Sequence, residues 1–201
     1  MKLVLASNNA HKLTELSTLF APLGIDLLPQ SALGLSDADE PHPTFVENAL
    51  AKARHAAHAT GFAAIADDSG LCVDALGGSP GVMSARFATL FGHDKSDANN
   101  NKVLLEHLSQ STDRRAHFVS VLVALRAPED PEPLITFGRW PGVVLREPRG
   151  QGGFGYDPLV FIEALGLSVA ELGAEVKNKF SHRAAASRQM LSLMREVWGC
   201  G

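Results

Sequence analysis

Two adjacent carboxylates, Asp67 and Asp68, are the side chains of this 201-residue chain whose types and spacing most directly suggest chemistry. They follow residues 63–66, a short run of small and apolar residues that is typical of a buried strand. Such a strand brings the two acids to the rim of a sheet, where open α/β sheets bind ligands. Successive strand residues point to opposite faces, so we expect different roles for the two carboxylates. Alone, the Asp-Asp-Ser-Gly unit could equally be an Asx-type turn.

A polar segment near the N-terminus is a candidate anion site. The apolar residues 2–6 predict a strand, and leucine and phenylalanine at helical spacing predict a helix after residue 12. Exposed N–H groups at a helix entrance attract anions. A cation in the first turn opposes the helix dipole, which favours a phosphate beside Lys12, although a solvated lysine is the alternative. The segment consists of Ser7, Asn8, Asn9, Ala10, His11 and Lys12.

The remaining patterns predict an α/β protein. Apolar runs predict strands at 25–28, 114–126, 134–144 and 159–162, and the strands 114–126 and 134–144 are expected to pair as a long hairpin. Helices are expected from Thr44 to about Thr60, after Ser96 or Asp97, briefly after Ser168, and toward the C-terminus up to Gly199. The length suits one large domain or two tightly joined lobes, and we treat residues 1–201 as a single domain.

Other polar residues lie where they could face a ligand or only water. The linker 30–43 is acidic and includes Glu40, and loops of this kind are either solvated or used for binding. On the following alanine-rich helix, Glu47 opens the first turn, and Asn48 and Lys52 share one face because they are four residues apart.

The glycine-rich segment 150–158 formally matches the dinucleotide pattern G-x-G-x-x-G. That pattern requires a following helix, whereas an apolar run typical of a strand follows here, so we reject a Rossmann site. Phe154 and Tyr156 could stack on a base, or they could be core aromatics of a strand connector. Further along, Lys177, Lys179, His182 and Arg183 cluster just before or at the start of the last helix, as a second anion-friendly site or as a solvated basic turn.

Composition narrows the class of protein. The formal net charge of −4 argues against a nucleic-acid polymer as partner, because phosphate-backbone binders usually carry a basic face. Cys72 and Cys200 match no metal-ligand spacing, and no secretory or membrane-spanning segment precedes them. These features predict a soluble cytoplasmic protein with no membrane partner.

Together the segments resemble the parts of a magnesium–nucleotide site. Free carboxylates repel polyphosphate, so Asp68 can assist only through a divalent metal, and Mg²⁺ takes one or two carboxylates together with phosphate oxygens. A P-loop motif is absent, which excludes the standard nucleotide-driven motors and switches. A nucleotide-binding regulator without catalysis and a phosphatase that removes the γ-phosphate remain as alternatives.

In the same order along the chain, these segments resemble those of the inosine triphosphate pyrophosphatases. The resemblance covers almost the whole sequence. Its motifs are Ser7-Asn8-Asn9 with Lys12, Phe45-x-Glu47-Asn48-Ala49 with Lys52, Ala66-Asp67-Asp68-Ser69-Gly70-Leu71, residues 81–86, Gly152-Gly153-Phe154-Gly155-Tyr156-Asp157-Pro158, and Ser181-His182-Arg183.

The resemblance implies a long mixed sheet flanked by helices, with two lobes around a central nucleotide cleft, usually as a homodimer. It implies hydrolysis of XTP, ITP and dITP to the monophosphate and pyrophosphate with Mg²⁺. By resemblance, Asp68 is the catalytic acceptor and a metal ligand, Glu40 is a second metal-associated carboxylate, and Lys12 stabilises the leaving group. Asp67 or Glu47 would assist Asp68. The expected substrate contacts are residues 7–12, Lys52, Ser69, Phe154, Gly155, Tyr156, Asp157, Lys177, His182 and Arg183.

Overall fold

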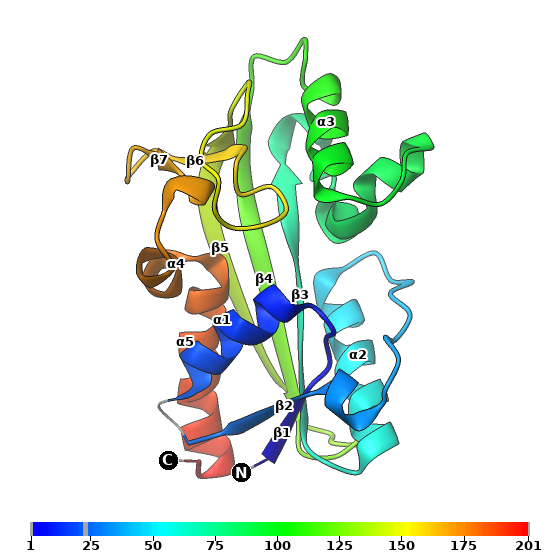
Figure 1. Ribbon diagram of the computed structural model, residues 1–201. Helices are drawn as coiled ribbons and strands as arrows, with labels where there is room; N and C mark the ends of the chain where they lie inside the picture. The colour runs from blue at the N-terminus through cyan, green and yellow to red at the C-terminus, as the bar shows by residue number, and fades with distance from the viewer. Residues whose placement is uncertain (1, 22–23, 201) are drawn as a thin grey trace. The chain divides into compact units, whose positions relative to one another are not determined.

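The structure, a computed structural model, describes residues 2–21 and 24–200 (Figure 1). It divides into two compact units, which we describe separately. Unit 1 comprises Met1–Asp68, Ser120–Gly138 and His182–Gly201, and unit 2 comprises Ser69–Val119 and Arg139–Ser181. Because both units are discontinuous, residues that are far apart in the sequence meet within each of them.

The described residues form strands and helices in alternation, as expected for an α/β protein. The strands are β1 (Lys2–Leu5), β2 (Asp26–Pro29), β3 (Ala64–Val73), β4 (Arg115–Leu125), β5 (Leu134–Val144), β6 (Val160–Ile162) and β7 (Leu167–Ser168). The α-helices are α1 (Ala10–Phe20), α2 (Phe45–Thr60), α3 (Asp97–His107), α4 (Ala174–Phe180) and α5 (His182–Trp198). Short 3-10 segments are η2 (Gln30–Leu33), η3 (Asp74–Leu76), η4 (Gly81–Phe91) and η5 (Val169–Glu171).

The sheet is mixed. In unit 1 the strand order is β2-β1-β3-β4-β5, and β1 is parallel to both β2 and β3, with Lys2 opposite Asp26 and Val4 opposite Ala64. In unit 2 the order is β3-β4-β5-β6-β7, and β6 is antiparallel to both neighbours. The expected α/β fold with a long mixed sheet and flanking helices is confirmed. None of the helices in the described part of the chain is long and apolar enough to cross a membrane.

The helices of unit 1 cover both faces of its strands. Figure 1 shows α1 and α5 together on one side and α2 on the other. Helix α1 buries Leu16 and Phe20, one turn apart, beside Met190 and Met194 of α5. The buried side of α2 consists only of small and polar side chains, so this helix can approach the sheet closely. Its buried alanines are Ala49, Ala53, Ala56 and Ala57.

Unit 2 has a core of its own beneath strands β3 to β6. Leu71 and Val73 of β3 pack there with Trp140 of β5 and Tyr156 of the glycine-rich segment. Leu104 of α3 belongs to the same cluster, which fixes α3 on this unit.

Three sequence expectations differ from the structure. Strand β3 does not end before the acids but continues through them to Val73, because Leu71 and Val73 alternate into the core of unit 2; the turn alternative is wrong. The capping box at Ser168 opens only one 3-10 turn, η5. Lys177 and Lys179 lie just before the last helix, as expected, but they belong to a separate helix, α4, that the sequence did not predict.

We expect Gly138→Ala to destabilise the protein by about 1–3 kcal/mol, the usual cost of overpacking. A Cβ atom at Gly138 in β5 would collide with the backbone of α5 at His182 and Ala186, and backbone atoms cannot move away cheaply. Gly173→Ala is the control, because no atom lies within 4 Å of the added methyl group. Chemical unfolding of both variants measures the difference. Equal free energies of unfolding would show that β5 and α5 do not depend on this close approach.

Candidate active site

The carboxylate of Asp67 is fully buried in unit 1 and binds two cations. Lys12 Nζ lies 3.0 Å from Asp67 Oδ2. Arg183 donates to the same oxygen through Nε at 3.3 Å and Nη2 at 3.2 Å, and through Nη1 it pairs with Glu15. Ser120 Oγ donates to Asp67 Oδ1 at 2.7 Å. Since a buried charge is costly unless it is paired and hydrogen-bonded, these contacts allow Asp67 to remain ionised in the interior.

The contacts of Asp67 join segments that are distant in the sequence. Lys12 lies in the first turn of α1, Arg183 in the first turn of α5 and Ser120 in the middle of β4. Lys12 is therefore not the solvated lysine of the alternative interpretation, because its ammonium group is held against β3. It also donates to the backbone carbonyl of Asp67 at 3.3 Å.

The pKa shifts follow from burial and pairing. Burial would raise the pKa of the Asp67 carboxyl, but Arg183 and Lys12 outweigh it and hold that pKa well below its ordinary value. For Lys12, burial dominates and lowers the pKa despite the attraction of Asp67. For Lys52, the attraction of Asp68 and of Glu40 outweighs burial, and the pKa is raised.

The next residue, Asp68, faces a different set of partners. Its Oδ1 accepts a hydrogen bond from Lys52 Nζ at 2.8 Å, and the same ammonium group donates to Glu40 Oε1 at 2.7 Å and to the carbonyl of Asp67 at 3.1 Å. Asp68 Oδ2 is buried and makes no hydrogen bond to any of the described residues. Burial raises the pKa of Asp68, against the opposing effect of Lys52. One oxygen of this carboxylate is thus available to a further ligand.

Glu40 is brought to Lys52 by a loop that is fastened on both sides. On one side, Asp37 Oδ1 accepts hydrogen bonds from the side-chain amides of Asn8 and Gln30, at 2.9 and 2.6 Å. On the other side, the buried amide of Asn48 both accepts from and donates to the backbone of residue 42, each at 3.0 Å. The acidic linker is therefore ordered by side chains of the predicted anion segment and of α2.

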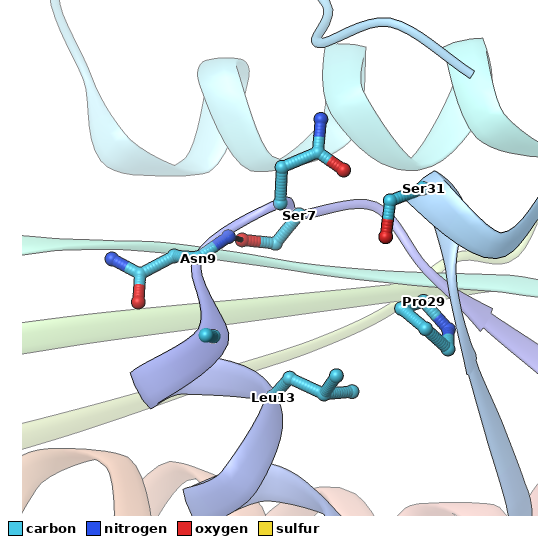
Figure 2. A pocket seen from close by; sticks show the side chains of 7 residues that line it. Ser7, Asn9, Leu13, Pro29 and Ser31 are labelled. Atoms are coloured by element: carbon cyan, nitrogen blue, oxygen red, sulfur yellow. Dashed lines mark hydrogen bonds between the residues drawn. The ribbon is translucent and has the colours of Figure 1, made fainter. Parts of the chain in front are cut away.

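The predicted anion segment forms the entrance of α1. Asn9 is the N-cap, and its side chain accepts a hydrogen bond from the backbone N–H of Lys12 at 3.1 Å. The hydroxyl of Ser7 accepts from the N–H of Asn9 at 3.2 Å, while Ala10 and His11 are exposed in the first turn. Figure 2 shows Ser7 and Asn9 at a pocket whose other walls come from α1, β2 and η2. Its remaining lining residues are Asn8, Ala10, Leu13, Pro29 and Ser31.

The residues predicted to hold a metal are two carboxylates that share one lysine. Asp68 and Glu40 meet through Lys52, so the structure brings them together. No group of three or more His, Cys, Asp or Glu side chains within residues 2–21 and 24–200 is arranged to hold a metal by itself. The pair fits Mg²⁺, which uses one or two protein carboxylates and takes other oxygens from phosphate or water. The unshared Oδ2 of Asp68 is a suitable oxygen ligand.

Unit 2 contains the predicted contacts of the glycine-rich segment. Asp157 Oδ2 accepts from the N–H of Phe154 at 3.0 Å and from Lys177 Nζ at 2.8 Å. Lys177 Nζ also lies 5.1 Å from the centre of the half-buried Phe154 ring, a cation–π distance. Gly153 has a φ of +75°, and any side chain there would collide with the Asp157 carboxylate, so this turn requires glycine.

Some predicted site residues have other local roles. Tyr156 belongs to the unit 2 core and its hydroxyl donates to the carbonyl of Ser84 at 3.0 Å, so its ring does not offer a face for stacking. Glu47 is exposed and bonded to Thr44 at the start of α2. Ser69 is half-buried in β3, and His182 is buried in the first turn of α5. Their assignments to the site stay predictions.

With this geometry in hand, the chain was compared with known proteins. The model of the Ham1 family matches residues 3–193. The chain belongs to the Ham1 family. It is 62% identical to the dITP/XTP pyrophosphatase of Methylibium petroleiphilum, over 98% of this chain and 99% of that protein. It is 60% identical to the dITP/XTP pyrophosphatase of Acidovorax sp., over 100% and 98%.

Solved structures agree. A HAM1 protein from Coxiella burnetii is similar with a TM-score of 0.90 and 43% identity, covering 98% of this chain and 100% of that one. The dITP/XTP pyrophosphatase from Mycobacterium abscessus is similar with a TM-score of 0.75 and 38% identity, covering 96% and 97%. The resemblance noted from the sequence motifs is confirmed.

Sequence reasoning missed two members of the Asp67 cluster in this Ham1 protein. Ser120 is the polar residue within an apolar run on both sides, and a buried hydroxyl of that kind requires a partner, which was a usable signal. Glu15 lies three residues after Lys12, on the same face of α1. Its pairing with Arg183 is 168 residues long in sequence and carried no local signal.

We expect Asp67→Asn to destabilise the protein by about 3–5 kcal/mol at pH 7, because it leaves Lys12 and Arg183 buried without their shared counter-charge. The pKa of Asp67 is lowered on folding, so its stabilising effect is complete above the unfolded value near 4 and is lost as the pH falls below it. The gap between wild type and variant should therefore narrow in acid. Urea unfolding at several pH values provides the measurement.

Asp113→Asn is the matched control. It removes a carboxylate that pairs with Arg115 at the surface of unit 2, and it should leave the melting temperature nearly unchanged. If Asp67→Asn behaves like this control, Asp67 does not hold the cluster together.

Proposed function

We propose that this Ham1 protein hydrolyses XTP, ITP and dITP to the monophosphate and pyrophosphate, which removes non-standard purine nucleotides from the nucleotide pool. The observation that carries the proposal is the convergence of the Lys12 and Lys52 ammonium groups on the Asp67 carbonyl, next to the Asp68 carboxylate with its unshared oxygen. Relatives about 60% identical over their full length are named dITP/XTP pyrophosphatases.

The charges of the unit 1 cluster support a divalent metal as cofactor, and we propose Mg²⁺. Among the described residues joined by these ion pairs, three cations stand against four carboxylates, so the cluster alone does not attract a triphosphate. The cations are Lys12, Lys52 and Arg183, and the carboxylates are Asp67, Asp68, Glu40 and Glu15. The chemistry that Mg²⁺ would supply here is neutralisation of charge on the phosphate chain. Asp68, with Glu40 beside it, would hold the ion.

The protein groups have separate tasks in the proposed reaction. Asp68 would orient the attacking water or take its proton, as expected of a carboxylate at the reacting phosphate. Lys12 and the N–H groups at the start of α1 bind the triphosphate and stabilise the charge that develops on the departing pyrophosphate. Lys52 holds Asp68 and Glu40 in place. Attack at the α-phosphorus follows from the family resemblance.

We assign the nucleoside to the ring of Phe154 with Asp157 and Lys177, which support that ring in unit 2. His182 and Arg183 are the proposed polar contacts of the base by resemblance. The guanidinium of Arg183 is already bonded to Asp67 and Glu15, so we give it a positioning task in addition. A homodimer is likewise proposed from the resemblance and is tested by sedimentation. A cytoplasmic location is proposed from the sequence composition and is tested by cell fractionation.

Hydrolysis of ITP by the purified protein should stop when excess chelator is added and should resume with Mg²⁺, and IMP and pyrophosphate should be the products. The reason is that Asp68 cannot approach a polyphosphate without a cation between them. Chromatography of the products with a pyrophosphate assay distinguishes the alternatives. IDP and phosphate would identify a γ-phosphatase, no turnover would favour a binding protein, and full turnover in chelator would exclude the metal.

Asp68→Asn should lower kcat by a factor on the order of 10²–10⁴ while the fold remains intact, since the change is nearly isosteric and removes a proton acceptor. Lys52 retains Glu40 as a partner in this variant. Turnover and the melting temperature are measured together. Loss of the fold with normal activity per folded molecule would show that Asp68 is structural.

A further inference from the structure

Helix α3 bonds both the backbone N–H and the backbone carbonyl of Gly155 in unit 2. The N–H of Gly155 donates to Asp97 Oδ2 at 2.7 Å, and Asn101 Nδ2 donates to the carbonyl of Gly155 at 3.0 Å. Asp97 and Asn101 are four residues apart and therefore share one face of α3. One helix thus bonds both backbone polar groups of Gly155, which belong to the two peptide groups on either side of its Cα atom.

Gly155 directly follows Phe154, the residue assigned above to the base. Gly155 has a φ of +59°, a conformation that lets the chain reverse between the Phe154 ring and the core residue Tyr156. Gly155 was predicted to contact the substrate, but its N–H group is already bonded to Asp97. We therefore expect Gly155 to act by orienting the Phe154 ring rather than by donating to the nucleotide.

We propose that Asp97 and Asn101 are positioning residues for purine recognition: by fixing the Gly155 backbone they hold the Phe154 ring in the orientation that stacks on the base. In this proposal Asp97 and Asn101 act on the base through Phe154, without a contact of their own to the nucleotide. The proposal rests on the proposed function, because it requires Phe154 to contact the base. It extends the nucleoside site to α3, to which none of the sequence motifs assigned a role.

The experiment measures KM and kcat for ITP and the inhibition constant of inorganic tripolyphosphate, a ligand without a base. Asp97→Ala and Asn101→Ala should each raise KM roughly 3- to 10-fold, the equivalent of one hydrogen bond, with kcat and the tripolyphosphate constant unchanged. Asp97→Asn should restore the wild-type KM, because its amide oxygen still accepts from Gly155. Asn99→Ala is the matched control on α3, since that side chain bonds only the carbonyl of Asp94 outside the segment.

Phe154→Ala separates this proposal from the function on which it rests. A raised KM in Phe154→Ala, with no further increase on adding Asp97→Ala, supports positioning through the ring. A raised KM in Phe154→Ala but not in the α3 variants, or additive effects, would overturn the positioning role and leave the function intact. An unchanged KM in Phe154→Ala overturns both the stacking of Phe154 on the base and the positioning role of Asp97 and Asn101. An equal loss of tripolyphosphate binding would make the bonds from α3 general structural contacts, and the two α3 variants are independent tests should one of them fail to fold.

Discussion

The pairing of one buried negative charge, that of Asp67, is the constraint on which the arrangement of unit 1 depends. A carboxylate with no exposure to water must find cations and hydrogen bonds inside the protein, and it finds them in the first turns of α1 and α5 and in the middle of β4. Each of those segments is also fixed by apolar packing, with Leu16 and Met190 in one core. The ion pairs therefore select which turn of each helix faces β3, while the apolar contacts supply the adhesion. The consequence for chemistry is that Lys12 has a single defined position before any ligand arrives.

Asp67 and Asp68 show how a strand assigns unlike tasks to like residues. Side chains alternate along β3, so the first acid meets Lys12 and Arg183 and the second meets Lys52. Arg183 and Lys12 both act on Asp67 and lower its pKa despite its burial. For Asp68, burial outweighs the attraction of Lys52, and its pKa is raised. The carboxylate of Asp67 has both oxygens bonded within the protein, to Lys12, Arg183 and Ser120. Asp68 retains an oxygen without a partner, which is the property that a ligand or a proton requires.

The sequence predicted those parts of the fold and site that depend on local patterns. Apolar periodicity predicted the strand pair 115–125 and 134–144, and capping chemistry predicted the helix from Phe45 to its stop at Gly61. The sequence did not predict where β3 ends, because its continuation depends on a core completed by residues 140–162. It left two alternatives open for Tyr156, because an aromatic side chain beside glycines is equally suited to a core and to a ligand, and the structure places this ring in the unit 2 core. The pairings of Arg183 with Glu15 and of Asp97 with Gly155 have no sequence signature at all, as they join side chains brought together only by the folded chain.

Lys12 and Lys52 of unit 1 are paired with carboxylates of the protein itself, which affects how they can bind an anion. A lysine that is free in solvent loses rotamer entropy when it captures a phosphate, whereas Lys12 and Lys52 have already lost it on folding. The same pairing reduces the net attraction for an anion, since Asp67 and Glu40 compete for these ammonium groups. A rigid cluster with almost balanced charge thus gains orientation at the expense of raw electrostatic affinity. A ligand that brings its own divalent cation would reverse this balance, because the cation turns the surplus carboxylate from a repulsive into an attractive group. We therefore expect such a cluster to favour metal-bound polyphosphates over free anions, in keeping with the metal-assisted hydrolysis proposed above.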